Sequence, residues 1–157
     1  MERAALDPAV AELVAGYPVV VTTLVAWGDM DANSHVNNVV YFRYMEHARL
    51  KYFREMVFNK EQRESGVGPI LAWTDCRFRI PLEYPDNVTI ATRVSEVGDD
   101  RFTMDTIIVS HKHKAIAAQG QQKLVVYDYR KGVKAKMPDE MRRKIGEIEA
   151  SAQPKAD

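Results

Sequence analysis

The stretch from Val39 to Phe58, VVYFRYMEHARLKYFREMVF, decides the fold of this chain. It runs for 20 residues without glycine or proline, which is too long for an ordinary strand and predicts a helix. Its apolar residues are spread over more than one narrow stripe of that helix. A helix with this pattern is normally buried on several sides, so we expect the rest of the chain to surround it.

A dense polar segment, WGDMDANSHVNN at 27–38, comes directly before this helix. Asn37 or Asn38 is predicted to cap the helix. The first-turn N–H groups have no partner within the helix and, with the helix dipole, they stabilise negative charge on an attacked carbonyl oxygen. Asp31 and His35 lie within the same loop. An acid or a base beside such an oxyanion site predicts acyl transfer.

The same loop also has purely structural interpretations. The pattern D-x-D-x-N opens calcium loops, but those loops need Gly at position six and Glu at position twelve, where this chain has Ser34 and Val40. We therefore predict no metal site. A single Asp, Asn or Ser is more commonly an ordinary turn or cap former. Asp29 either places a like charge beside Asp31 or is a solvated turn residue.

The composition excludes several classes of protein. The chain has 157 residues and is 46% hydrophobic, which suits one domain with a sizeable core. Its 22 basic residues balance 22 acidic ones, so no overall field recruits nucleic acid or an acidic membrane. The lone Cys76 cannot form an intramolecular disulfide and is predicted to be a packed small side chain. Without a signal-peptide pattern or a membrane-length apolar run, we expect a cytoplasmic protein.

The remaining elements are mostly strands separated by short turns. Connections this short join antiparallel neighbours, because parallel strands need a longer crossover. A closing helix is predicted from Pro138 onward, with acidic residues in its first turn. The chain therefore predicts an α+β fold, in which an antiparallel sheet of about five strands wraps around one long helix and a short C-terminal helix follows. The expected strands lie at 17–27, 70–82, 87–97, 101–111 and 115–129.

The segment HVNNVVYFRYMEHAR, from His35 to Arg49, follows Asp31 as it does in a known family. It resembles the helix opening of hotdog-fold acyl-CoA thioesterases of the 4-hydroxybenzoyl-CoA thioesterase type. FRIPLEYPDNVTIATRV and LVVYDYRKGV look like later strands of that family. The resemblance implies a hotdog thioesterase domain at 17–149, after an N-terminal flap at 1–16 and before a tail at 150–157.

The loop DMDANSHVNN is also similar to the D-x-N-x-H signature of plant acyl-carrier-protein thioesterases. By this resemblance, Asp31, Asn33 and His35 fall on catalytic positions. The backbone N–H of Asn38 falls on the position of the oxyanion donor. A thiolate with a pKa of about 8.5 leaves without full protonation, so no metal, cofactor or triad serine is required, and coenzyme A is part of the substrate.

Two chemical routes stay open at this stage. Asp31 either attacks the carbonyl and forms an anhydride, or acts as a base on water, which needs its pKa raised from about 3.9. His35 either activates water or locks the loop by hydrogen bonds. Glu46, on the central helix, is flanked by Arg43 and Arg49 and is predicted to form an ion pair rather than to join the catalytic set.

The expected function is hydrolysis of an acyl-CoA to free acid and thiol. The alternatives are an acyl-ACP thioesterase and a non-catalytic acyl-ligand-binding or scaffold protein; a dehydratase is disfavoured because its Pro- and Gly-rich His motif is missing. In the family, two sheets join edge to edge, so a homodimer or homotetramer is expected. The aromatic residues Tyr41, Tyr44, Phe53 and Trp73 either line an acyl channel or fill the core. Candidates for binding the phosphates of the acyl donor are Arg77, Arg79, Lys112, Lys114 and Arg130.

Overall fold

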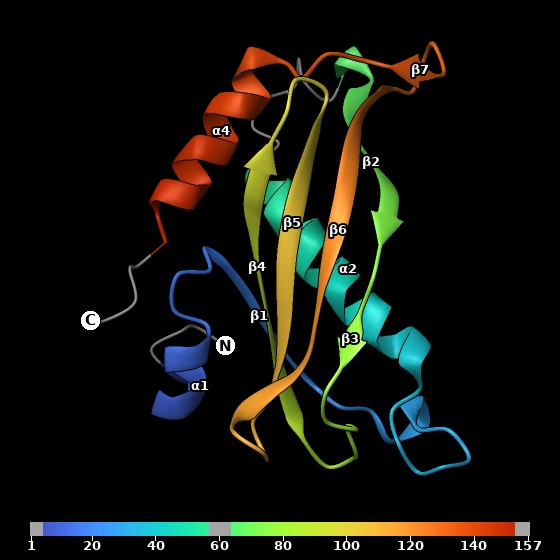
Figure 1. Cartoon of the computed structure of the whole chain (residues 1–157), viewed down its shortest axis with the longest axis vertical. Coiled ribbons are helices and arrows are strands. Elements are labelled where there is room, and N and C mark those ends of the chain that lie inside the picture. Colours follow the sequence, from blue (N-terminus) through green and yellow to red (C-terminus); the bar gives the residue numbers. More distant parts are fainter. Residues whose placement is uncertain (1–4, 57–63, 153–157) are drawn as a thin grey trace.

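The structure is a computed structural model that describes residues 5–56 and 64–152. An antiparallel sheet in the order β1-β4-β5-β6-β2 curls around one long helix, α2 (Asn38–Met56) (Figure 1). Two short strands, β3 and β7, both pair with β6. The predicted α+β architecture is confirmed. The strands are β1 (Val19–Leu24), β2 (Val67–Thr74), β3 (Arg77–Phe78), β4 (Asn87–Val97), β5 (Arg101–Ser110), β6 (Ala115–Asp128) and β7 (Val133–Lys134).

Two of the predicted strands have different bounds in the structure. The first is shorter than expected, because the chain turns into a short 3-10 helix, η2 (Trp27–Asp29), before the polar loop. The strand predicted at 70–82 is divided into β2 and β3. At this division the chain passes so close to Gly120 of β6 that a Cβ atom there would lie 2.1 Å from the carbonyl oxygen of Asp75. Glycine is the residue that permits this approach.

The central helix is buried on one face only. Tyr44, Met45 and Tyr52 point toward the sheet and are almost fully buried. Val39 is 60% exposed and Leu50 is 45% exposed on other faces of α2. The prediction of a helix surrounded on several sides is therefore wrong for the single chain, because the sheet covers only part of its circumference.

A chain of polar side chains divides the core beneath α2. Arg49 of α2 donates to Oε1 of Gln122, and Nε2 of Gln122 donates to Oγ1 of Thr106 at 3.0 Å. The hydroxyls of Thr106 and Thr92 are 2.8 Å apart. Each of these four side chains thus has a hydrogen-bond partner, as burial requires.

Apolar clusters lie on both sides of this polar chain. The cluster nearer the start of α2 includes Tyr41, Tyr44 and Ile90. The cluster nearer its end includes Tyr52 and Phe102. We call these two ends of the molecule the loop end and the far end.

Two further helices pack against the sheet and α2. α1 (Pro8–Leu13) lies on the outer face of the sheet, opposite α2, where its Val10 joins a cluster with Ile107 (Figure 1). α4 (Asp139–Ala150) packs beside the second half of α2 at the far end and has Pro138 at its N-cap, as predicted. No helix in the described residues is long and apolar enough to cross a membrane.

Candidate active site

The polar segment folds into a tight loop at 29–37, which we call the Asp31 loop. The N–H of Asp31 donates to the carbonyl of His35 at 2.8 Å, and the N–H of Ser34 donates back to the carbonyl of Asp31 at 2.9 Å. The N–H of Asn37 donates to the carbonyl of Asp29 at 2.9 Å. Ser34 has a φ of 61°, in the left-handed region that non-glycine residues rarely adopt. These backbone bonds on both sides hold it there.

The loop leads directly into the N-terminus of α2. Asn37 caps the helix, since its Oδ1 accepts from the N–H of Val39 at 3.0 Å and its carbonyl accepts from the N–H of Val40 at 2.9 Å. The N–H of Asn38 has no acceptor in the described part of the chain. One donor of the first turn is therefore left open toward the loop, at the residue on which the oxyanion position was predicted to fall.

The three predicted catalytic side chains lie close together along the loop without bonding to one another. Asp31 is exposed, and its Oδ1 accepts from the backbone N–H of Asn33 at 2.8 Å. Asn33 is exposed as well. His35 is half-buried, and its Nε2 lies 3.4 Å from Oε1 of Glu83. The acidic neighbour of the histidine ring is thus Glu83.

Glu83 is a residue that the sequence analysis did not single out. It follows β3 in the segment leading to β4, 48 positions after His35. Its other carboxylate oxygen lies 3.9 Å from Nζ of Lys112. No local pattern links these residues, because only the curl of the sheet brings the 80–86 segment against the Asp31 loop.

A hollow of about 240 Å³ opens beside the loop, and we call it the loop-end hollow. Its wall includes His35, Asn38 and Arg79. The ring of Tyr41 packs edge-on against Phe78 at 4.9 Å between centroids and forms the aromatic side of the hollow. The hydroxyl of Tyr41 is fixed by the N–H of Leu82 at 3.0 Å.

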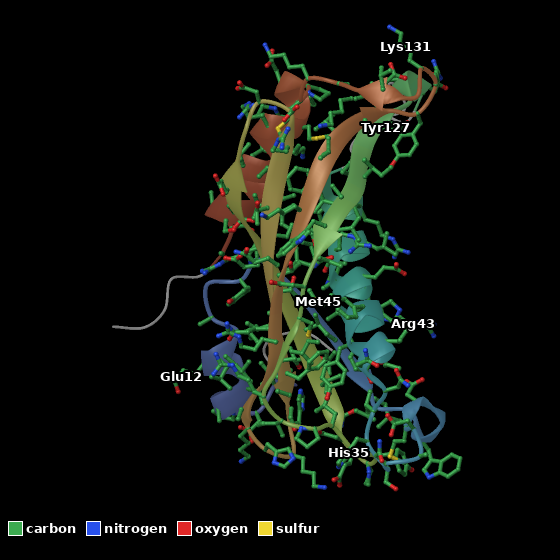
Figure 2. All side chains as sticks on the ribbon, turned by 45° about the vertical axis from the view of Figure 1, so that its right-hand side comes forward. Glu12, His35, Arg43, Met45, Tyr127 and Lys131 are labelled. Carbon is green, nitrogen blue, oxygen red and sulfur yellow. The ribbon has the colours of Figure 1, made fainter. Side chains whose placement is uncertain are left out.

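The basic residues proposed to bind phosphates are distributed unevenly. Arg79 lines the loop-end hollow, while Arg77 lines a second hollow on the outer face of the sheet. Lys112 lies beside Glu83, and Lys114 is paired with Asp7 at 3.2 Å. Arg130 is adjacent to Lys131, which lies at the opposite end of the molecule from His35 (Figure 2). Arg130 is therefore remote from this site within the chain.

Tyr44 of α2 lies near Asp29, the first residue of the Asp31 loop. The Tyr44 hydroxyl is buried and has no hydrogen-bond partner among the described residues. Burial first, and then the nearby Asp29 carboxylate, raise the pKa of Tyr44 to about 12. Asp29 is half-buried rather than fully solvated.

The other candidate aromatic residues are separated in space. Phe53 packs against Phe102 in the cluster at the far end, so it belongs to the core there. Trp73 is exposed on β2, with Nζ of Lys123 at 4.6 Å from its ring centroid. Neither residue lines the loop-end hollow.

Two other predictions about single side chains are confirmed. Glu46 forms an ion pair with Arg49 at 3.6 Å. Cys76 is half-buried against the loop-end cluster, where burial and then Asp75 raise its pKa to about 11. It is a protonated, packed thiol at neutral pH.

A groove of about 310 Å³ runs between α2 and β2, starting next to the N-terminus of the helix. Its first part is apolar, with Val39, Phe42 and Leu71. Arg43, Glu46 and Arg49 line the part farther along the helix. We call it the α2–β2 groove.

Comparisons with known proteins identify the family. Residues 25–145 match the model of the thioesterase-like superfamily. A thioesterase from Thermus thermophilus, solved in complex with coenzyme A and Zn, has a TM-score of 0.75 and 27% identity, over 86% of this chain and 96% of that one.

Two solved structures from Staphylococcus aureus share the fold at lower identity. A DHNA-CoA thioesterase has a TM-score of 0.73 and 15% identity, over 84% of this chain and 91% of its own. A protein in complex with CoA has a TM-score of 0.77 and 12% identity, over 88% and 87%. With more than half of its length matched by the family model, the chain belongs to the thioesterase-like superfamily.

Proposed function

We propose that this protein is an acyl-CoA thioesterase whose reaction takes place at the Asp31 loop. The observation that carries the proposal is the open N–H of Asn38 at the start of α2, beside Asp31 and His35. A thioester carbonyl that accepts from this N–H gains stabilisation as its oxygen becomes negative, and the helix dipole adds to it.

Asp31 supplies the carboxylate, by one of two routes. In the first, its oxygen bonds to the carbonyl carbon, the C–S bond breaks and the thiolate leaves, and water then hydrolyses the resulting anhydride. In the second, Asp31 takes a proton from the water that attacks the carbonyl. A single turnover in ¹⁸O-water tests the first route, because heavy oxygen enters Asp31 only if an anhydride forms and water attacks its Asp31 carbonyl carbon.

His35 acts beside the carboxylate, with Glu83 as its orienting partner. A carboxylate 3.4 Å from Nε2 holds the orientation of the ring. The other ring nitrogen is then the one that exchanges a proton with water or with the departing thiolate. Asn33, which is exposed on the same loop, is assigned to substrate binding.

The acyl group is assigned to the α2–β2 groove, and a second copy of the chain closes it. β2 ends the sheet, and its apolar side chains Ile70, Leu71 and Trp73 are partly exposed along that edge. Pairing of two such edges buries these side chains and the unpaired backbone groups. Sedimentation should therefore give a mass of two or four chains, and a monomer would contradict this assembly.

The test of the function is thiol release from short, medium, long and aromatic acyl-CoAs by wild type and Asp31→Asn. We expect wild type to hydrolyse at least one class and the variant to lose about 10³-fold in kcat, with an unchanged unfolding transition. The same acyl groups on acyl carrier protein test the alternative donor. If wild type bound acyl-CoA but did not hydrolyse it, the proposal of an enzyme would be wrong and the protein would be an acyl-CoA-binding protein.

A further inference from the structure

The strand β3 separates the loop-end hollow from the outer face of the sheet. It pairs only with β6 within the described residues, with Arg77 opposite Gln119 and Phe78 opposite Ala118. Its other edge is therefore free in the single chain. Phe78 faces Tyr41 and the loop-end hollow, whereas Arg77 lines a hollow on the outer face. A ligand bound at Asn38 can therefore pass through the loop-end hollow and over the free edge of β3 to the outer face of the sheet.

The hollow on the outer face is polar, and we call it the polar hollow. It has a volume of about 380 Å³. The guanidinium of Arg93 lies 4.8 Å from the ring centroid of Tyr17, and Nε of Arg93 is buried without a partner in the described part of the chain. Such a buried donor is normally satisfied, by a ligand or by water where no protein group serves. Further lining residues are Asp75, Arg77, Gln119 and Gln121.

The acidic groups of the polar hollow are already engaged. Asp105 lies 3.8 Å from Nη2 of Arg93 and accepts from Nε2 of Gln121 at 2.8 Å. Oδ1 of Asp75 accepts from the N–H of Gln121 at 2.8 Å. Both carboxylates are therefore bonded to other side chains or backbone groups of the protein.

Arg77 and Arg79 differ from these engaged groups. Both are exposed, and neither guanidinium makes an ion pair or a hydrogen bond with the residues at 5–56 and 64–152. Arg77 faces the polar hollow and Arg79 faces the loop-end hollow, so one guanidinium lies at each of the two hollows that β3 separates. An arginine at each hollow suits the phosphates of a ligand that passes from one hollow to the other, because a guanidinium binds phosphate in a bidentate manner.

We propose that the nucleotide half of coenzyme A crosses the free edge of β3, with its diphosphate on Arg79 and Arg77 and its nucleoside in the polar hollow. This inference rests on the proposed function, which places the thioester at Asn38. The pantetheine arm then passes Phe78 in the loop-end hollow. A nucleoside, rich in donors and acceptors, suits the amides of Gln119 and Gln121. The arm of an acyl carrier protein ends in one phosphodiester and has no nucleoside, so this path is specific to coenzyme A.

The test compares one acyl group on two thiols, coenzyme A and N-acetylcysteamine, which has no phosphate. We expect Arg77→Ala and Arg79→Ala each to lower kcat/KM for the acyl-CoA about tenfold, through KM, because a charge-assisted hydrogen bond is lost. Hydrolysis of the N-acetylcysteamine thioester should not change. Lys131→Ala, which removes a positive charge at the opposite end (Figure 2), should leave both substrates unaffected.

A third substrate tests the position of the nucleoside. Gln119→Ala should raise KM for the acyl-CoA but not for the same acyl group on 4′-phosphopantetheine, which has a phosphate and no nucleoside. If these variants lost activity equally on all thioesters, or kept unchanged kinetics with acyl-CoA, the inference would be overturned. The proposed thioesterase function would not be affected by either result. If wild type hydrolysed no thioester, the proposed function would fail first, and calorimetry of coenzyme A binding to wild type and the arginine variants would still decide the inference.

Discussion

Two tyrosines on α2, eight residues apart, have opposite surroundings. Residues at this spacing lie just over two turns apart and face the same side of a helix. At the far end, the Tyr52 hydroxyl donates to Oε1 of Glu149 at 2.7 Å, and the same oxygen accepts from the N–H of Val94 at 2.7 Å. At the loop end, the Tyr44 hydroxyl is buried without a partner among the described residues.

This difference distinguishes the two ends of the molecule. The far end is closed by α4, whose Met141 and Ile145 pack against α2, and its polar groups find partners within the chain. The loop end keeps the N–H of Asn38 and the carboxylate of Asp31 accessible. A polar group without a partner lowers the stability of a fold. Open donors and exposed acids are therefore expected where a ligand completes the hydrogen bonds, which supports the proposal that the chemistry takes place at the loop end.

The largest effect on this comparison should come from Asn38→Pro. Proline removes the N–H but is well tolerated at the first position of a helix. We expect kcat to fall about 100-fold with little change in the unfolding midpoint, because only the oxyanion donor is lost. Asn38→Ala keeps the N–H and should retain activity. Full activity of the proline variant would show that the open donor has no catalytic role.

The two tyrosines can be compared directly by removing each hydroxyl. Tyr52→Phe should lower the free energy of unfolding by about 1 to 2 kcal/mol, because Glu149 loses a donor. Tyr44→Phe should raise it by about 1 kcal/mol, since it removes a buried hydroxyl that has no partner. Urea unfolding of both variants measures the difference. Equal losses would mean that the Tyr44 hydroxyl is satisfied in solution.

A smaller effect is expected at the helix cap. Asn37→Ala should lower the free energy of unfolding by about 1 kcal/mol, because the N–H of Val39 loses its acceptor. Asn38→Ala serves as the matched control, since no hydrogen bond of the Asn38 side chain is seen in the described part of the chain. If Asn38→Ala lowered the free energy of unfolding as much as Asn37→Ala, the assignment of the cap to Asn37 would be wrong.

The smallest effect is a pH dependence at the far end. Burial raises the pKa of Glu149 above its usual value of 4.5, so the folded protein binds this proton more tightly than the unfolded chain. Its contribution to stability is therefore fully present below pH 4.5 and is lost as pH rises through the raised pKa. Glu149→Gln removes this titration. The unfolding free energy of wild type minus that of the variant should fall across this window, and a flat difference would contradict the assignment.

Much of this fold is predictable from sequence because its signals are local. The uninterrupted run after Asn38 predicts α2, the short turns predict antiparallel pairing, and the polar segment predicts the loop and its cap. The division of β2 from β3 is not predictable in this way, because it depends on a carbonyl passing over Gly120 of a strand far along the chain. Exposure of Val39 was likewise missed, since the pattern of a helix does not say which sides a single chain covers.

The candidate site likewise has a part that local sequence predicts and a part that depends on the fold. Asp31, Asn33, His35 and the open N–H of Asn38 lie on one continuous segment, so sequence alone brings them together. Glu83 reaches His35 only through the curl of the sheet. The polar hollow draws its walls from β3, β4, β5 and β6 and has no signature in any one segment.

The most direct measurement is a crystal structure with an acyl-CoA analogue in which a methylene group replaces the thioester sulfur. We expect its carbonyl oxygen about 3 Å from the backbone nitrogen of Asn38, with the Asp31 carboxylate beside the carbonyl carbon. A carbonyl bound away from the loop end, with the N–H of Asn38 still open, would contradict the central claim.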